Sequence, residues 1–223
     1  MTGTLSAWSP APDLPDGVLL LGPMGETPDY WEGVLAHLSD VRTVVHRRGG
    51  RANLDDELSA TWRTAESAGI RAPLVVGASL GGIVGRLLAL DRPVPGLVLL
   101  DSAMEDFPGD LDLPEEVRRA LRDELTENDE DIDVLAAHAR LRDERRPGMY
   151  GERPVWVVAR GRNDWPTDPD VATALQEGWT RGQRSLTELS NRVRFVQPED
   201  SGHHIAVDRP DLVAAVISEA MQG

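Results

Sequence analysis

The chain of 223 residues contains no cysteine and no lysine, and each absence excludes a class of chemistry. Without cysteine there is no thiol nucleophile, no disulfide framework and no thiolate metal site. Without lysine there is no Schiff base to a carbonyl or pyridoxal group. A phosphate-binding loop of the kind that ends in Gly-Lys-Ser/Thr is excluded for the same reason. Hydroxyls, imidazoles, carboxylates, arginines or a bound cofactor must therefore carry any chemistry.

Positive charge is scarce and long apolar runs are missing. The 38 acidic residues outnumber the 23 arginines and give a net charge of −15, which argues against nucleic acid or an anionic membrane as a partner. The apolar runs are only a few residues long, far below the length of a spanning helix. The first 16 residues have neither a basic start nor an apolar centre, so we do not expect them to be a signal peptide. We expect a cytoplasmic protein.

Short apolar runs alternate with amphipathic stretches along the chain, the pattern of an α/β fold with a mostly parallel central sheet and helices on both faces. The strands are expected at 18–21, 41–45, 74–76, 97–100, 155–159 and 193–196. Helices are expected at 28–38, 54–65, 80–90, from 171 onward and at 210–221. The chain has no internal repeat and no low-complexity linker, so residues 1–223 are predicted to form a single domain.

One segment interrupts this alternation. Residues 113–146 have apolar residues at helical spacing and predict two helices, so we expect a small helical lid at about residues 105–150. Between residues 101 and 133 there are fourteen carboxylates and three arginines. This charge is interpreted as a solvated helical surface rather than a cation site.

The most informative motif lies between a predicted strand and a predicted helix. Gly77-Ala-Ser79-Leu80-Gly81 follows the apolar run at 74–76 with no loop between strand and helix. A serine on so tight a turn is raised above the sheet, and the small residues on either side avoid collisions. The N–H of Leu80 and the positive end of the helix are directed at any negative charge that forms beside Ser79. These are the requirements of acyl-transfer chemistry.

The glycines of this motif also loosely resemble the dinucleotide-binding turn of short-chain dehydrogenases. That family has the loop after its first strand and requires a Tyr-x-x-x-Lys pair. Here the loop follows the third predicted strand, and the chain has no lysine. The dehydrogenase interpretation is therefore excluded.

Nearly the whole chain resembles the α/β-hydrolase superfamily. In that superfamily a histidine lies in a loop after the last strand, and Ser201-Gly202-His203, followed by Asp208-Arg-Pro, matches this loop. The resemblance implies that His203 takes the proton from Ser79 and returns it to the leaving group. His204 is predicted to line the pocket or pack, His37 and His138 to be surface or packing residues, and His46 to be structural.

The resemblance also implies an acidic partner for the histidine, for which two candidates remain. Asp164, in Gly161-Arg-Asn-Asp164, resembles the usual position after the next-to-last strand. Asp101 resembles the position that many haloalkane dehalogenases use, at the end of the preceding strand. Many hydrolases carry a merely structural aspartate there, so Asp164 is the favoured candidate.

The resemblance places a second oxyanion donor just after the first strand, where relatives usually have His-Gly. This chain has Gly22-Pro23, and the N–H of Met24 is then the expected donor beside Leu80. Because proline stiffens the loop, the hole is reshaped or loses a donor, which typically costs about 3–4 kcal/mol of transition-state stabilisation. Arg47, Arg48 and Arg51 follow the second strand, and we interpret them as a solvated cluster rather than a site for an acidic substrate group.

These residues predict a serine hydrolase that acts on a small ester or thioester through a Ser-His-Asp triad and a covalent acyl-enzyme. Met24, Tyr30, Met104 and Trp165 are candidates to line the substrate pocket. Neither cofactor nor metal is required, and a monomer or homodimer is expected. The same triad occurs in lyases, cyclases and carbon–carbon hydrolases. A non-catalytic ligand-binding relative is the alternative of a different class, favoured by the Gly22-Pro23 departure.

Overall fold

The computed structural model describes residues 14–49, 53–127 and 132–223. Six strands pair in parallel in the order β2-β1-β3-β4-β5-β6. Their bounds are β1 (Gly17–Leu21), β2 (Thr43–His46), β3 (Pro73–Ala78), β4 (Gly96–Leu100), β5 (Pro154–Val158) and β6 (Arg192–Val196). The predicted α/β fold with a parallel central sheet is confirmed.

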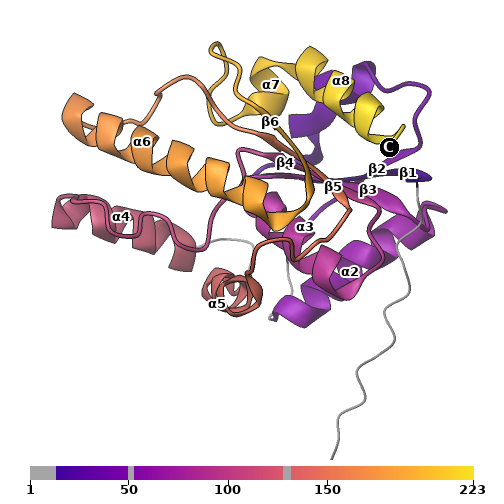
Figure 1. Cartoon of the computed structure of the whole chain (residues 1–223), viewed down its shortest axis with the longest axis horizontal. Helices are drawn as coiled ribbons and strands as arrows, with labels where there is room; N and C mark the ends of the chain where they lie inside the picture. Colours follow the sequence, from indigo (N-terminus) through magenta and orange to yellow (C-terminus); the bar gives the residue numbers. More distant parts are fainter. Residues whose placement is uncertain (1–13, 50–52, 128–131) are drawn as a thin grey trace, which may run out of the picture.

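Helices cover both faces of this sheet (Figure 1). One face packs against α2 (Leu54–Ser67) and α3 (Leu80–Asp91), and α6 (Pro169–Ser185) and η2 (Leu186–Leu189) contribute to the same core. The other face packs against η1 (Pro28–Trp31), α1 (Glu32–Ala36), α7 (Ile205–Asp208) and α8 (Pro210–Ala220). The apolar runs of the inner strands therefore separate two cores.

Burial along the strands follows from this layering. The strands β1, β3 and β4 are buried at every residue, as expected for parallel strands with both faces covered. The edge strand β6 is partly exposed, and its arginines Arg192 and Arg194 point to solvent. Charged side chains on an edge strand oppose pairing with another chain.

Two predicted boundaries are wrong. The helix predicted at 28–38 is a 3-10 turn followed by the short helix α1, which ends at Ala36. The strand predicted from residue 41 begins at Thr43, because the Val41 amide still donates to the Leu38 carbonyl in the preceding turn.

Two helices lie between β4 and β5 at the predicted segment: α4 (Glu115–Thr126) and α5 (Val134–Glu144). The helix α4 has no buried residue and lies away from the sheet beside α6 (Figure 1). Its acidic residues are exposed as predicted, while Val117, Leu121 and Leu125 line a pocket. Across the described ranges, no helix combines the length and apolar character needed to span a membrane.

The start of α3 lies in close contact with the backbone at the end of β1. Substituting two glycines of α3 is therefore expected to affect stability differently. An added Cβ at Gly81 would overlap the carbonyl oxygen of Leu21 and lie 2.7 Å from that of Gly22. At Gly85 it would meet only side chains, with Val75 Cγ1 at 3.0 Å. We expect Gly81→Ala to lower the free energy of unfolding by about 3 kcal/mol or more.

Gly85→Ala is the matched control, and its expected change is within about 1 kcal/mol because alanine favours the helix. Urea unfolding followed by circular dichroism measures both. Equal effects of the two substitutions would contradict the role assigned to Gly81.

Candidate active site

Ser79 occupies a strained turn between β3 and α3. Its backbone angles are φ 49° and ψ −119°, in a region that serine rarely adopts. The Ser79 amide donates to the Leu100 carbonyl at 3.1 Å, and its carbonyl accepts from the Ala103 amide at 3.0 Å. Hydrogen bonds to the end of β4 and to the loop that follows it thus hold the serine at the carboxyl edge of the sheet.

His203 reaches this edge from the loop between β6 and α7. Its Nδ1 lies 2.6 Å from Oδ2 of Asp101, which follows β4 and also has a positive φ of 41°. The Asp101 side chain is fully buried, whereas that of His203 is 26 % exposed. The structure therefore brings together an imidazole and a carboxylate that are 102 residues apart in the chain.

The Asp101 carboxylate accepts three more hydrogen bonds. Oδ1 accepts from Trp179 Nε1 at 2.7 Å and from the Arg160 amide at 3.0 Å, and Oδ2 accepts from Arg160 Nε at 2.8 Å. Burial alone raises the pKa of Asp101, but the His203 hydrogen bond and the Arg160 charge outweigh it and lower the pKa below its ordinary value. An ionised carboxylate only accepts, so His203 Nδ1 carries the proton and Nε2 is left as the basic nitrogen.

Arg160 is the charge that compensates Asp101, and its role was not predicted from the sequence. It is 4 % exposed, and its guanidinium carbon lies 4.4 Å from the ring centre of Trp165 and 4.9 Å from that of Trp179. Its Nη2 is 3.4 Å from His203 Nδ1. Because that nitrogen already carries a proton, the contact is electrostatic rather than a donated hydrogen bond.

Asp164, the acid favoured from the sequence, makes a different contact. Its Oδ1 accepts from Arg160 Nη1 at 3.1 Å, and its Oδ2 lies 3.7 Å from Arg162 Nη2. The hydrogen bond to His203 comes from Asp101. The structure thus gives the imidazole a different contact from the one favoured by the sequence: Arg160 lies between the Asp164 carboxylate and the ring, and Asp101 binds Nδ1.

The histidine loop is fastened to the loop that carries Asp164. The Ser201 carbonyl accepts from the amides of Gly161 and Arg162 at 3.0 and 2.9 Å. The Gly202 amide donates to Asp208 Oδ2 at 2.7 Å, which explains the acidic residue of the Ser-Gly-His motif. An added Cβ at Gly202 would collide with the Asp164 carboxylate, so this glycine allows the two loops to pack directly.

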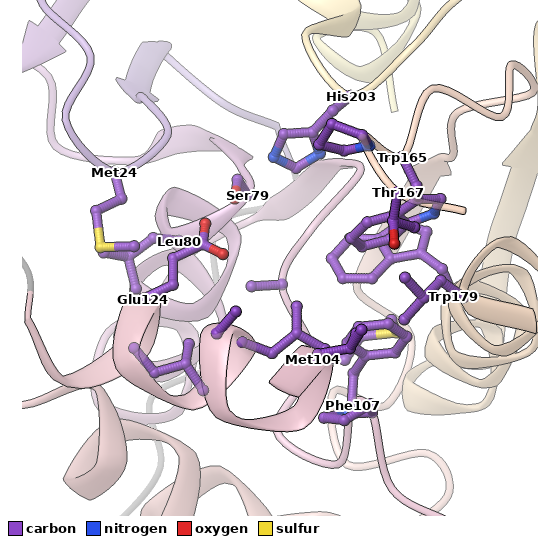
Figure 2. Close-up of a pocket in the computed structure, with 18 of the residues that line it drawn as sticks. Met24, Ser79, Leu80, Met104, Phe107, Glu124, Trp165, Thr167, Trp179 and His203 are labelled. Atoms are coloured by element: carbon purple, nitrogen blue, oxygen red, sulfur yellow. The ribbon is translucent and has the colours of Figure 1, made fainter. Parts of the chain in front are cut away.

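Ser79 and His203 line one pocket of about 590 Å³ (Figure 2). No hydrogen bond joins the Ser79 hydroxyl to the His203 ring within the described chain, although both face the same space. Met24, Met104 and Trp165 line this pocket as predicted from the sequence.

Tyr30 is the substrate-lining candidate that the structure contradicts. It does not line this pocket but lies in the core at 5 % exposure, in edge contact with Trp31 and His204 at 5.0 and 5.9 Å between ring centres. His204 itself lines the pocket, in agreement with one of the two roles predicted for it.

The residues expected to supply the oxyanion donors, Leu80 and Met24, lie beside Ser79 on the pocket wall. Arg48 holds the loop in which Gly22-Pro23 replaces the usual His-Gly. Its Nη1 and Nη2 donate to the carbonyls of Gly22 and Pro23, each at 2.6 Å. Arg48 is thus not merely a solvated cation. Arg47 is exposed, and Arg51 lies outside the described residues.

Comparisons with known proteins identify the fold of the chain. No protein-family model matches the chain. A probable hydrolytic enzyme of Pseudomonas aeruginosa PAO1 is similar in structure, with a TM-score of 0.64 and 15 % identity over 96 % of this chain and 88 % of that one. This chain has the α/β-hydrolase fold. Haloalkane dehalogenase DbeA of Bradyrhizobium elkani USDA94 shares the fold with a TM-score of 0.62, 14 % identity, and coverage of 96 % and 92 %.

A curated sequence relative matches at 22 % identity over 206 residues, or 86 % of this chain and 78 % of the relative, which is "Uncharacterized protein YqjL" of Bacillus subtilis (strain 168). No group of three or more histidine, aspartate or glutamate side chains suited to a metal ion occurs in the described part of this α/β-hydrolase-fold protein.

Several residues of the site escaped the sequence analysis. Phe107 and Trp179 line the pocket, and each contacts the Trp165 ring at 5.8 Å between ring centres. The only available signals were a lone phenylalanine after the fourth strand and a tryptophan at helical spacing. Both signals indicate core packing equally well.

The burial of the Arg160–Asp101 pair predicts a pH-dependent loss of stability in Arg160→Met. At pH 7 the variant leaves the Asp101 carboxylate buried with fewer donors and no cation, at a cost of about 3–5 kcal/mol. Asp101 has a lowered pKa in the native protein, so its stabilising effect is present above its unfolded pKa of about 3.9 and is lost as pH falls. Without Arg160 the pKa of Asp101 is higher, so Asp101 becomes protonated at a higher pH in the variant than in the native protein. Protonation removes the buried charge, so the deficit in the variant's free energy of unfolding shrinks as pH falls from 7 toward 5.

Urea unfolding across this pH range measures the deficit. Arg194→Met is the matched control, because Arg194 pairs with Glu219 on the exposed face of β6 and is expected to contribute under about 1 kcal/mol. A deficit for Arg160→Met that is constant with pH would contradict the coupling to Asp101.

Proposed function

We propose that this protein is a serine hydrolase acting on small esters or thioesters, with Ser79 as nucleophile, His203 as base and Asp101 as the acid of the triad. The observation that carries the proposal is the coincidence of a strained serine with a histidine whose Nδ1 is held by a buried, ionised carboxylate, both on one pocket. Strain at a surface turn is retained where surrounding contacts enforce it, which is typical of functional residues.

The proposed reaction begins when Ser79 Oγ attacks the ester carbonyl carbon while His203 Nε2 accepts the hydroxyl proton. The carbonyl oxygen becomes an oxyanion facing the amides of Leu80 and Met24, at the positive end of α3. The carbon–oxygen or carbon–sulfur bond then breaks, and His203 returns the proton to the leaving alcohol or thiol. His203 then deprotonates a water that attacks the acyl carbon, and it returns the proton to Ser79 Oγ as the bond to the acid breaks. Hydrogen bonds between catalytic groups commonly tighten only around substrate.

The roles proposed for Arg160 and Arg48 are to position other groups. Arg160 orients the Asp101 carboxylate through its amide and Nε, and its charge keeps that carboxylate ionised. Arg48 fixes the carbonyls on either side of the Pro23 backbone nitrogen, so the Met24 amide that follows is presented by a braced loop rather than a free one.

Comparing Asp101→Asn with Asp164→Asn tests the choice of acid. Asparagine at 101 cannot hold the Nδ1–H tautomer through an anionic acceptor, so kcat for a 4-nitrophenyl ester is expected to fall about a thousandfold or more. Asp164→Asn changes only a partner of Arg160, so a loss below about tenfold is expected. Circular dichroism and the urea midpoint confirm that each variant is folded. A larger loss at 164 than at 101 would reverse the assignment.

An activated-serine probe tests the nucleophile directly. A fluorophosphonate is expected to label wild-type protein at Ser79, and labelling is expected to vanish in Ser79→Ala and to fall strongly in His203→Ala. Ser201→Ala, which removes a buried hydroxyl of the histidine loop instead, controls for nonspecific phosphonylation. A folded wild-type protein that neither labels nor hydrolyses any of a panel of aryl esters would favour the non-catalytic ligand-binding relative.

A further inference from the structure

The wall of the pocket formed by α4 carries two carboxylates without a cationic partner. Glu116 and Glu124 lie two turns apart with Ala120 between them, and all three line the pocket. Within the described residues neither carboxylate forms an ion pair or a hydrogen bond. Figure 2 shows the Glu124 side chain extending from α4 with its carboxylate directed toward Leu80 and Ser79.

A buried imidazole on the same pocket also lacks a partner. His138, from α5, lines the pocket and is 4 % exposed, and its Nε2 is buried without a hydrogen bond. Burial lowers the pKa of the His138 ring, so at neutral pH the ring is uncharged and one nitrogen accepts. Buried polar atoms are normally paired, so an unpaired nitrogen in a ring that lines a pocket is available to a ligand entering beside it. The prediction that His138 is a surface or packing residue therefore leaves out its place on the pocket.

The pocket contains no free cation to balance these acceptors, as far as the described residues go. The arginine that lines it, Arg160, already donates hydrogen bonds to Asp101 and Asp164 and lies against two tryptophan rings. The whole chain adds to the imbalance, with 38 acidic residues against 23 arginines. A field of this sign draws cations toward the pocket and repels anions.

We infer that the substrate carries a primary ammonium group, which binds between α4 and α5 to the Glu124 carboxylate and the His138 ring, with Glu116 adding negative charge. The inference rests on the proposed function, because it names the substrate class for the same pocket. An ammonium group has three N–H donors and one positive charge, so it satisfies a carboxylate and a neutral imidazole together. A substrate ending in a carboxylate would meet like charges, which supplies specificity by repulsion.

Three 4-nitrophenyl esters that differ only in the terminal group test this inference: 6-aminohexanoyl, heptanoyl and monopimeloyl. A shorter pair, 3-aminopropanoyl and butanoyl, tests whether the ammonium is bound nearer to Ser79. We expect wild-type kcat/KM to be at least about tenfold higher for the amino ester than for the carboxylate ester. Glu124→Gln is expected to lower the amino-to-methyl ratio by about fivefold, and His138→Leu by about threefold. Comparing ratios between variants removes the intrinsic reactivity of each ester.

Glu115→Gln is the matched control, because Glu115 lies on the same helix, changes the net charge equally and does not line the pocket. Its amino-to-methyl ratio is expected to stay within about twofold of wild type. Turnover of all the esters with the same ratio in wild type and Glu124→Gln would overturn the ammonium site and leave the hydrolase standing.

Calorimetry with n-hexylammonium and hexanoate separates the two proposals if no ester is turned over. Binding of the ammonium but not of hexanoate, weakened in Glu124→Gln and unchanged in Glu115→Gln, would support the site even though the hydrolase proposal had failed. Absence of ammonium binding would overturn the site as well.

Discussion

The arrangement at the carboxyl edge of the sheet depends on one buried carboxylate. Asp101 accepts from His203, from Trp179 and twice from Arg160, so its two oxygens tie together β4, β5, α6 and the histidine loop. Burying an isolated carboxylate would cost more than the fold can offset, and it is tolerated here because every donor is in place. The orientation of the imidazole follows from that network.

One guanidinium contacts both members of the Asp101–His203 pair. Arg160 Nε donates to the Asp101 carboxylate at 2.8 Å, while Nη2 of the same guanidinium lies 3.4 Å from His203 Nδ1. The arginine therefore keeps the carboxylate ionised and also contacts the imidazole that this carboxylate orients. The rings of Trp165 and Trp179 hold the guanidinium in place. The charge on Asp101 therefore depends on how the aromatic side chains of the pocket pack.

The features that the sequence predicts well are local. The Gly-x-Ser-x-Gly turn and the Ser-Gly-His loop could be located because each motif consists of residues that are adjacent in the sequence. The preference for Asp164 did not anticipate the hydrogen bond between Asp101 and His203, because both aspartates follow strands and no local rule says which side chain the histidine meets. The Asp164 carboxylate instead accepts a hydrogen bond from Arg160, a contact that no local motif indicates. Tyr30 was misassigned for a similar reason, since an aromatic ring near a loop packs inward or outward according to the helices around it.

Helix α4 has one property with wider consequences: none of its residues is buried, yet its apolar side chains form a wall of the pocket. Residues that contribute little to the core can be replaced at small cost in folding free energy. The surface that meets the ligand is thus largely separated from the surface that sustains the fold. Natural drift or a focused mutant library on this one helix could retune what the protein accepts without first having to restabilise it.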